Sequence, residues 1–157
     1  MTSINDSFET DNTTRKPQLL VLDDEASVRK LMVRILAREG YEIREASAVE
    51  EAYAAAKSME RLEVWVTDAN VDGSDASLQV ERFRALHPNL AVVLVSGCDP
   101  EAERHAILTQ LGVIFLAKPF TPVQLREAVD LSLRRGSTTS AVVCVAALTS
   151  EAAPVAR

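Results

Sequence analysis

The chain has 157 residues, which is enough for one domain with a buried core and not comfortably enough for two. It is acidic, with 23 Asp and Glu against 17 Lys and Arg, and this balance argues against a dedicated nucleic-acid-binding module, which needs a basic face. No signal segment opens the chain and no apolar run reaches the roughly 18 residues that a membrane-spanning helix needs, so we expect a cytoplasmic protein without membrane contact.

Residues 1–16 are polar and lack apolar periodicity, which is typical of a disordered lead-in. After them, short apolar runs alternate with helical patterns. Runs of Val, Ile and Leu of this length are typical of strands that are buried on both faces of a parallel sheet. The predicted strands are residues 18–22, 41–44, 62–66, 90–95 and 113–116.

Each gap between strands, and the segment after the last one, has the signals of a helix. Apolar residues of the first gap recur at i, i+3, i+4 and i+7, which is the spacing of one helix face. Ser47 with Glu50, and Thr121 with Gln124, have the spacing of capping boxes that open the second and fifth helices. The predicted helices are residues 25–39, 48–57, 76–86, 101–111 and 122–135.

The alternation of strands and helices predicts an α/β fold, because βαβ crossovers force neighbouring strands to run parallel. We expect a flavodoxin-like, doubly wound (βα)5 domain with a five-stranded parallel sheet; the order 2-1-3-4-5 is our choice among doubly wound orders. Residues 17–136 form the predicted domain. Residues 137–157 form a C-terminal tail that could be an interaction segment, an added strand or the start of a further segment.

Chemically reactive side chains follow four of the predicted strands. Ligands of an open parallel sheet bind outside the carboxyl ends of the strands, so these side chains should converge on one rim. The set comprises three acids, one hydroxyl and one ammonium group, namely Asp23, Asp24, Asp68, Ser96 and Lys118.

Such a group suits metal-assisted phosphoryl transfer. Clustered carboxylates favour a hard cation, Mg²⁺ first and Mn²⁺ as the second choice. A carboxylate beside that ion can attack phosphorus, because the metal and Lys118 neutralise charge on the phosphoryl oxygens while Ser96 donates a hydrogen bond to one of them. The product is an acyl phosphate, a labile mark that is suited to signalling.

Four motifs resemble the signatures of two-component response regulator receiver domains: VLDDE at 21–25, TDANVDG at 67–73, LVSG at 94–97 and LAKPF at 116–120. The resemblance covers residues 18–135. It implies a stand-alone receiver domain similar to the chemotaxis regulators, which acts in phosphorelay signal transduction and is not an enzyme with a turnover substrate.

The resemblance also implies a role for each site residue. Asp68 corresponds to the phosphoacceptor and Asp24 to the carboxylate that binds Mg²⁺ directly. Asp23 corresponds to the acid that reaches the metal through water, and Asn70 to the residue whose backbone carbonyl completes the metal site.

The resemblance also implies features of the family's switch. Ser96 and Lys118 correspond to the hydroxyl and the lysine around the phosphoryl group, and Phe115 to the aromatic residue whose rotation reports phosphorylation. The Lys118–Pro119 bond is expected to be cis.

The resemblance implies partners as well. The implied donor is a sensor histidine kinase or a histidine phosphotransfer protein. The implied target binds the face formed by the fourth helix, fifth strand and fifth helix, where homodimers also form in the family.

The chain departs from the family pattern at several positions. Val71-Asp72 replaces a common Met-Pro, Ala76 replaces a glycine, and Gly97 replaces the more usual alanine. None of these changes removes a reacting group. Asp72 is nevertheless the one hint of a different function, that of a phosphorylation-independent pseudo-receiver that acts only as an interaction module.

A phosphatase of the haloacid-dehalogenase type would also use an Asp nucleophile after a parallel strand. It needs a second Asp as general acid, however, where this chain has Asn70.

Taken singly, each site residue has an ordinary explanation: Asp23 and Asp24 as helix-capping acids, Asp68 as a turn residue, Lys118 as a surface lysine. Their joint placement after four strands favours the functional interpretation.

Overall fold

The computed structural model describes residues 15–97 and 102–135. The predicted tail and most of the predicted lead-in lie outside the described residues. Strands and helices alternate along the described chain: β1 (Gln18–Leu22), α1 (Ala26–Ala37), β2 (Glu42–Ala46), α2 (Val49–Ser58), β3 (Leu62–Asp68), α3 (Ala76–Leu86), β4 (Ala91–Ser96), α4 (Ala102–Gln110), β5 (Ile114–Ala117) and α5 (Pro122–Arg135).

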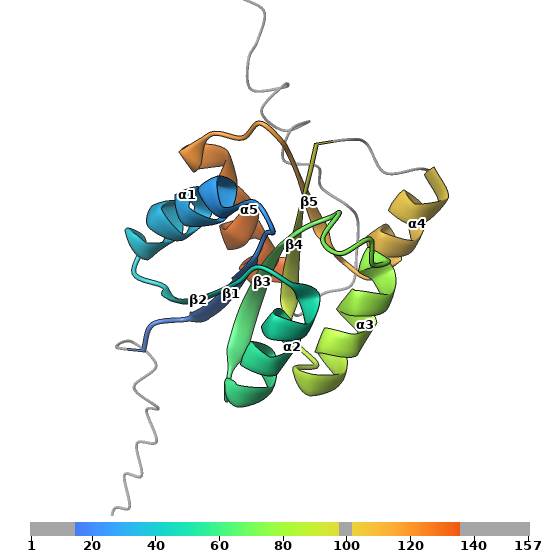
Figure 1. Cartoon of the computed structure of the whole chain (residues 1–157), viewed down its shortest axis with the longest axis horizontal. Helices are drawn as coiled ribbons and strands as arrows, with labels where there is room; N and C mark the ends of the chain where they lie inside the picture. The colour runs from blue at the N-terminus through green and yellow to red at the C-terminus, as the bar shows by residue number, and fades with distance from the viewer. Residues whose placement is uncertain (1–14, 98–101, 136–157) are drawn as a thin grey trace, which may run out of the picture.

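The five strands form one parallel sheet in the order β2-β1-β3-β4-β5, which confirms the predicted fold class and strand order. Helices cover both faces of this sheet (Figure 1): α1 and α5 lie on one side, and α2, α3 and α4 lie on the other. None of the described helices is long and apolar enough to cross a membrane.

Each inner strand contributes to both layers, because successive side chains of a strand point to opposite faces. Trp65 of β3 packs in the layer under α2, α3 and α4, whereas its neighbours Val64 and Val66 pack under α1 and α5. The inner strands β1, β3 and β4 are therefore continuous apolar runs, and this is why the sequence reveals them.

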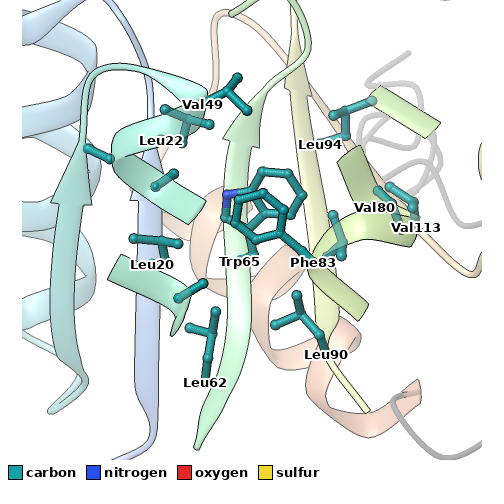
Figure 2. Packing of buried hydrophobic residues seen from close by; sticks show 14 of the residues in the cluster. Leu20, Leu22, Val49, Leu62, Trp65, Val80, Phe83, Leu90, Leu94 and Val113 are labelled. Atoms are coloured by element: carbon teal, nitrogen blue, oxygen red, sulfur yellow. The ribbon is translucent and has the colours of Figure 1, made fainter. Parts of the chain in front are cut away.

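The largest side chains of the first layer are stacked. The rings of Trp65 and Phe83 lie with centroids 4.0 Å apart and planes within 4° (Figure 2). The edge of Tyr53 meets Phe83 at 5.5 Å. An aromatic pair of this kind contributes about 0.5–1.5 kcal/mol beyond the burial of its area. The contacts join β3 to α3 three residues before the strand ends at Asp68.

The predicted ends of the elements differ from the structure at three informative places. β3 continues to Asp68, which pairs with Val95 of β4, so the acid belongs to the strand and not to the turn. β2 lies at Glu42–Ala46 and not at 41–44; it is an edge strand with a largely exposed, polar pattern, which weakens the apolar signal. The remaining ends differ by two residues or fewer, including those of α1, which begins at Ala26 and ends at Ala37 within the predicted 25–39.

The two predicted capping boxes have different outcomes. At α5 the box is confirmed: the Thr121 backbone N–H donates to Gln124 Oε1 at 2.8 Å, and the Gln124 N–H donates to Thr121 Oγ1 at 3.2 Å. At α2 the predicted pair of Ser47 with Glu50 is wrong. Because the helix begins one residue later, Ser47 donates instead to Glu51, through its backbone N–H at 2.8 Å and its hydroxyl at 2.9 Å.

Candidate functional site

The carboxyl ends of four strands lie side by side at one edge of the sheet. β1 and β3 are in register up to Leu22 and Thr67, and β4 and β5 up to Ser96 and Ala117. Backbone hydrogen bonds continue this order just beyond the strands. The Ala69 N–H donates to the Val95 carbonyl at 2.9 Å, and the Lys118 N–H donates to the Ser96 carbonyl at 2.8 Å. The residues that follow each strand are therefore held at one rim.

Three carboxylates meet at this rim. One oxygen from each of Asp23, Asp24 and Asp68 lies within 4.8 Å of the other two. Their environments differ: Asp23 is fully buried, Asp68 has a side chain that is 11% exposed, and Asp24 is exposed to solvent. Like charges at this separation repel one another unless a cation lies among them.

Lys118 supplies part of the compensating charge. Its Nζ lies 3.2 Å from Asp23 Oδ2 and 3.5 Å from Asp68 Oδ1. Burial lowers the pKa of Lys118, but the hydrogen bond and charge of Asp23, together with the charge of Asp68, outweigh burial and raise that pKa overall. The lysine is therefore a cation that touches two of the three acids.

Asp23 is fixed by the turn that follows β1. Its Oδ1 accepts the Glu25 backbone N–H at 2.9 Å, and its carbonyl accepts a hydrogen bond from the Arg29 guanidinium at 2.8 Å. Burial raises the pKa of Asp23 more than the Glu25 N–H and Lys118 lower it. A buried carboxylate with this balance gains from any further positive charge that is brought close to it.

The donor set of the cluster fits a hard divalent cation. Every ligand atom that it offers is a carboxylate oxygen, and Mg²⁺ prefers oxygen ligands while keeping several of its waters. The exposed side of the cluster, where Asp24 lies, leaves room for such waters. One ammonium group against three carboxylates also leaves negative charge for a cation to neutralise.

The remaining predicted site residues lie around this cluster. Asn70 is exposed in the loop two residues after Asp68. Ser96 ends β4, is partly buried and contacts Lys118 through the backbone bond already described. Phe115 is a buried residue of β5 that belongs to the layer under α2, α3 and α4. The Lys118–Pro119 peptide bond is cis.

Sequence reasoning missed one contact of the loop that follows Asp68. The sequence suggests that Asp72 adds a negative charge beside the acceptor, but its Oδ2 accepts the Val49 backbone N–H at 2.9 Å, at the start of α2. Two local signals could have suggested this contact. The residue before α2 is Ala48, whose side chain has no acceptor, and the Asp72-Gly73 pair is a common turn sequence.

Known proteins resemble this chain in sequence and in fold. The family described as response regulator receiver domain matches residues 19–130. The chain is 32% identical over 130 residues to Transcriptional regulatory protein ResD of Bacillus subtilis (strain 168), covering 81% of this chain and 52% of that protein. It is 30% identical over 121 residues to Sensor kinase CckA of Brucella abortus (strain 2308), covering 74% of this chain and 12% of that protein.

Solved structures agree on the architecture. The crystal structure of a response regulator receiver domain protein (CheY-like) from Methanospirillum hungatei JF-1 matches with a TM-score of 0.69 at 22% identity, covering 78% of this chain and 97% of that chain. This likeness shows the shared fold. The chain spans about half the length of ResD and a much smaller part of CckA.

Proposed function

Because the chain belongs to the response regulator receiver domain family of two-component systems, we propose that it is a phosphoacceptor switch in which Asp68 takes a phosphoryl group. One observation carries the proposal: an oxygen of Asp68 lies within 4.8 Å of a carboxylate oxygen of each of Asp23 and Asp24, and Asp68 Oδ1 lies 3.5 Å from Lys118 Nζ. A nucleophile, a set of metal ligands and a fixed cation thus surround one point at the open edge of the sheet.

The reaction uses Asp68 as a nucleophile. A carboxylate oxygen attacks the phosphorus of a phosphohistidine on a sensor histidine kinase or phosphotransfer protein; an O–P bond forms, the P–N bond breaks, and the imidazole leaves with the bond electrons. Lys118 holds one phosphoryl oxygen and Ser96 donates a hydrogen bond to another. Mg²⁺, or Mn²⁺ in its place, would be held by Asp23, Asp24, Asp68 and the Asn70 carbonyl and would neutralise charge on the phosphoryl oxygens.

The output is a change of conformation at the face formed by α4, β5 and α5. Lys118 immediately follows β5, and Phe115 lies within it, so a lysine drawn toward a phosphoryl group acts on the strand that carries the aromatic residue. Ser96 at the end of β4 is drawn inward with it. The two populations of this face differ in affinity for a downstream protein or for a second copy of the chain.

The receiver unit that we propose comprises residues 17–136, between a lead-in of residues 1–16 and a tail of residues 137–157. We place the protein in the cytoplasm, where histidine kinases present their phosphohistidine. The relatives belong to different kinds of protein, a transcriptional regulator and a sensor kinase, so the output is a protein contact or phosphoryl relay that sequence similarity alone does not specify.

The two competing functions have less support. A haloacid-dehalogenase-type phosphatase lacks its general acid here, because Asn70 cannot transfer a proton. An inert pseudo-receiver depends on Asp72 as its one hint, and the contact of that residue with Val49 gives its presence another explanation.

Acetyl phosphate with MgCl2 tests the proposal directly. The wild type should gain one phosphoryl group in intact-mass spectra, and the gain should disappear with EDTA and in Asp68→Asn. Asp130→Asn, which removes an acid from the exposed surface of α5, is the matched control and should still be labelled. Absence of an adduct from both acetyl phosphate and a panel of histidine kinases would contradict the proposal.

A further inference from the structure

Asp72 caps a helix that belongs to another segment of the chain. It lies in the loop between β3 and α3, and its Oδ2 accepts the N–H of Val49, the first residue of α2, at 2.9 Å. Ala48, at the N-cap position of α2, makes no side-chain cap bond of its own. A carboxylate at this place satisfies a backbone donor that the helix leaves unpaired, and it lies at the positive end of the helix dipole.

The backbone around Asp72 is built for this contact. Asp72 has φ of 56° and Gly73 has φ of 64°, and the Ser74 N–H donates to the Val71 carbonyl at 3.2 Å. Two successive left-handed residues within such a bond are characteristic of a type I′ turn, for which Asp-Gly is a favoured sequence. Proline, which the family often has at the position of Asp72, cannot adopt a positive φ. The departure at this position therefore gives the loop a different turn.

Val71, the residue before Asp72, anchors the loop in the buried core. Val71 is only 3% exposed and belongs to the same buried cluster as Val49 and Leu22. Asp68, Val71 and Val49 also line one small cavity, so the phosphoacceptor, the loop and the start of α2 adjoin the same space. The loop and α2 thus share a buried apolar cluster and are joined by a charged hydrogen bond.

We propose that Asp72 is a positioning residue of the metal site. By anchoring the loop of residues 69–73 to α2, it holds the backbone of Asn70, which lies between Asp68 and the turn, where its carbonyl can serve the cation. Its own carboxylate is engaged at α2 and is not a ligand. This inference rests on the proposed function, because it assigns a role within the same site.

Two substitutions separate anchoring from charge. Asp72→Gly keeps the left-handed backbone and removes the acceptor, whereas Asp72→Asn keeps an acceptor and removes the charge. Glu81→Gln, which removes one charge from the exposed surface of α3, is the matched control. Binding of Mg²⁺ is followed by titrating each protein with MgCl2 alone and recording the fluorescence of Trp65, the one tryptophan of the chain, which lines the same cavity as Asp68.

The expected pattern follows from the role of groups that orient metal ligands. Asp72→Gly should raise the Kd for Mg²⁺ about tenfold, since such groups typically contribute about 10- to 100-fold in metal affinity. Asp72→Asn should stay within about threefold of the wild type, because Asn and Asp are comparable caps. An unchanged Kd in Asp72→Gly, or equal weakening in both variants, would overturn the inference, since equal weakening means that the charge itself acts on the cation.

A second readout is independent of the metal. In Asp72→Gly the Val49 amide should exchange hydrogen about fivefold faster, as expected for the loss of a cap contributing about 1 kcal/mol, and in Asp72→Asn it should remain protected. An unchanged hydrogen-exchange rate at the Val49 amide in Asp72→Gly would overturn the anchoring contact. A wild type that takes up neither Mg²⁺ nor a phosphoryl group contradicts the proposed function, and the inference falls with it. A wild type that is labelled, with normal Mg²⁺ affinity in Asp72→Gly, contradicts the inference alone.

Discussion

Lys118 forms its shorter ion pair with Asp23, at 3.2 Å, and not with the phosphoacceptor candidate Asp68, at 3.5 Å. The lysine thus neutralises the carboxylate that is fully buried, while it remains close to the one that would react. This arrangement gives Lys118 a part in the stability of the protein that does not depend on a phosphoryl group.

Lys118→Met should destabilise the metal-free protein by about 2 kcal/mol, because it leaves a buried carboxylate without its partner. The loss is smaller than the roughly 3–5 kcal/mol typical of fully buried pairs because water reaches the lysine, whose side chain is 23% exposed. Urea unfolding in EDTA measures the effect, with Lys30→Met on the exposed surface of α1 as control. Equal stability of the Lys118 variant and the wild type would show that the pair contributes nothing.

Asp24→Asn should have opposite effects with and without magnesium. In EDTA the variant should be more stable than the wild type by about 1 kcal/mol, since it relieves repulsion among three carboxylates. A saturating cation should stabilise the wild type by about 2.7 kcal/mol at a hundredfold excess over its Kd and should leave the variant nearly unchanged. Thermal unfolding over a series of MgCl2 concentrations measures both effects, and Glu60→Gln, at an exposed site, should behave as the wild type. A variant that retains the full magnesium response would place the cation elsewhere.

Phe83→Ala should be among the most destabilising substitutions in the core. The ring is fully buried and stacks on Trp65, so its removal leaves a cavity and should cost about 3–5 kcal/mol. Phe83→Leu, which retains most of the apolar volume, should lose clearly less. Urea denaturation followed by circular dichroism gives the free energy of unfolding for both variants. Similar losses for Ala and Leu would mean that the stacking, and not the filled volume, dominates.

The free energy of unfolding at alkaline pH should depend on Tyr41. Burial, with the carboxylate of Asp130 that accepts its hydroxyl at 3.3 Å, raises the pKa of Tyr41 to about 12, against about 10 in an unfolded chain. Between these values the unfolded tyrosine loses its proton while the folded one keeps it, so this contribution is complete below pH 10 and is lost as pH rises toward about 12. The difference in unfolding free energy between wild type and Tyr41→Phe should therefore shrink over this window, and a constant difference would contradict the assignment.

The sequence predicted the architecture because the inner strands are buried on both faces and leave continuous apolar runs. The rim could be predicted from topology alone, since parallel strands bring their carboxyl ends to one edge whatever their separation along the chain. Which acid takes the lysine could not: Lys118 and Asp23 are 95 positions apart, and their pairing depends on the burial of Asp23. The start of α2 was misplaced by one residue for a related reason, because the Val49 N–H finds its acceptor in Asp72, which lies 23 positions away along the chain.

The capping box of α5 has a consequence for the proposed switch. Only Pro119, Phe120 and Thr121 separate Lys118 from the first turn of the helix, and Thr121 is locked to Gln124 by two reciprocal hydrogen bonds. Under the proposed function, this short connection would pass a displacement of the Lys118 ammonium group toward a phosphoryl group on to the start of α5, a helix of 14 residues.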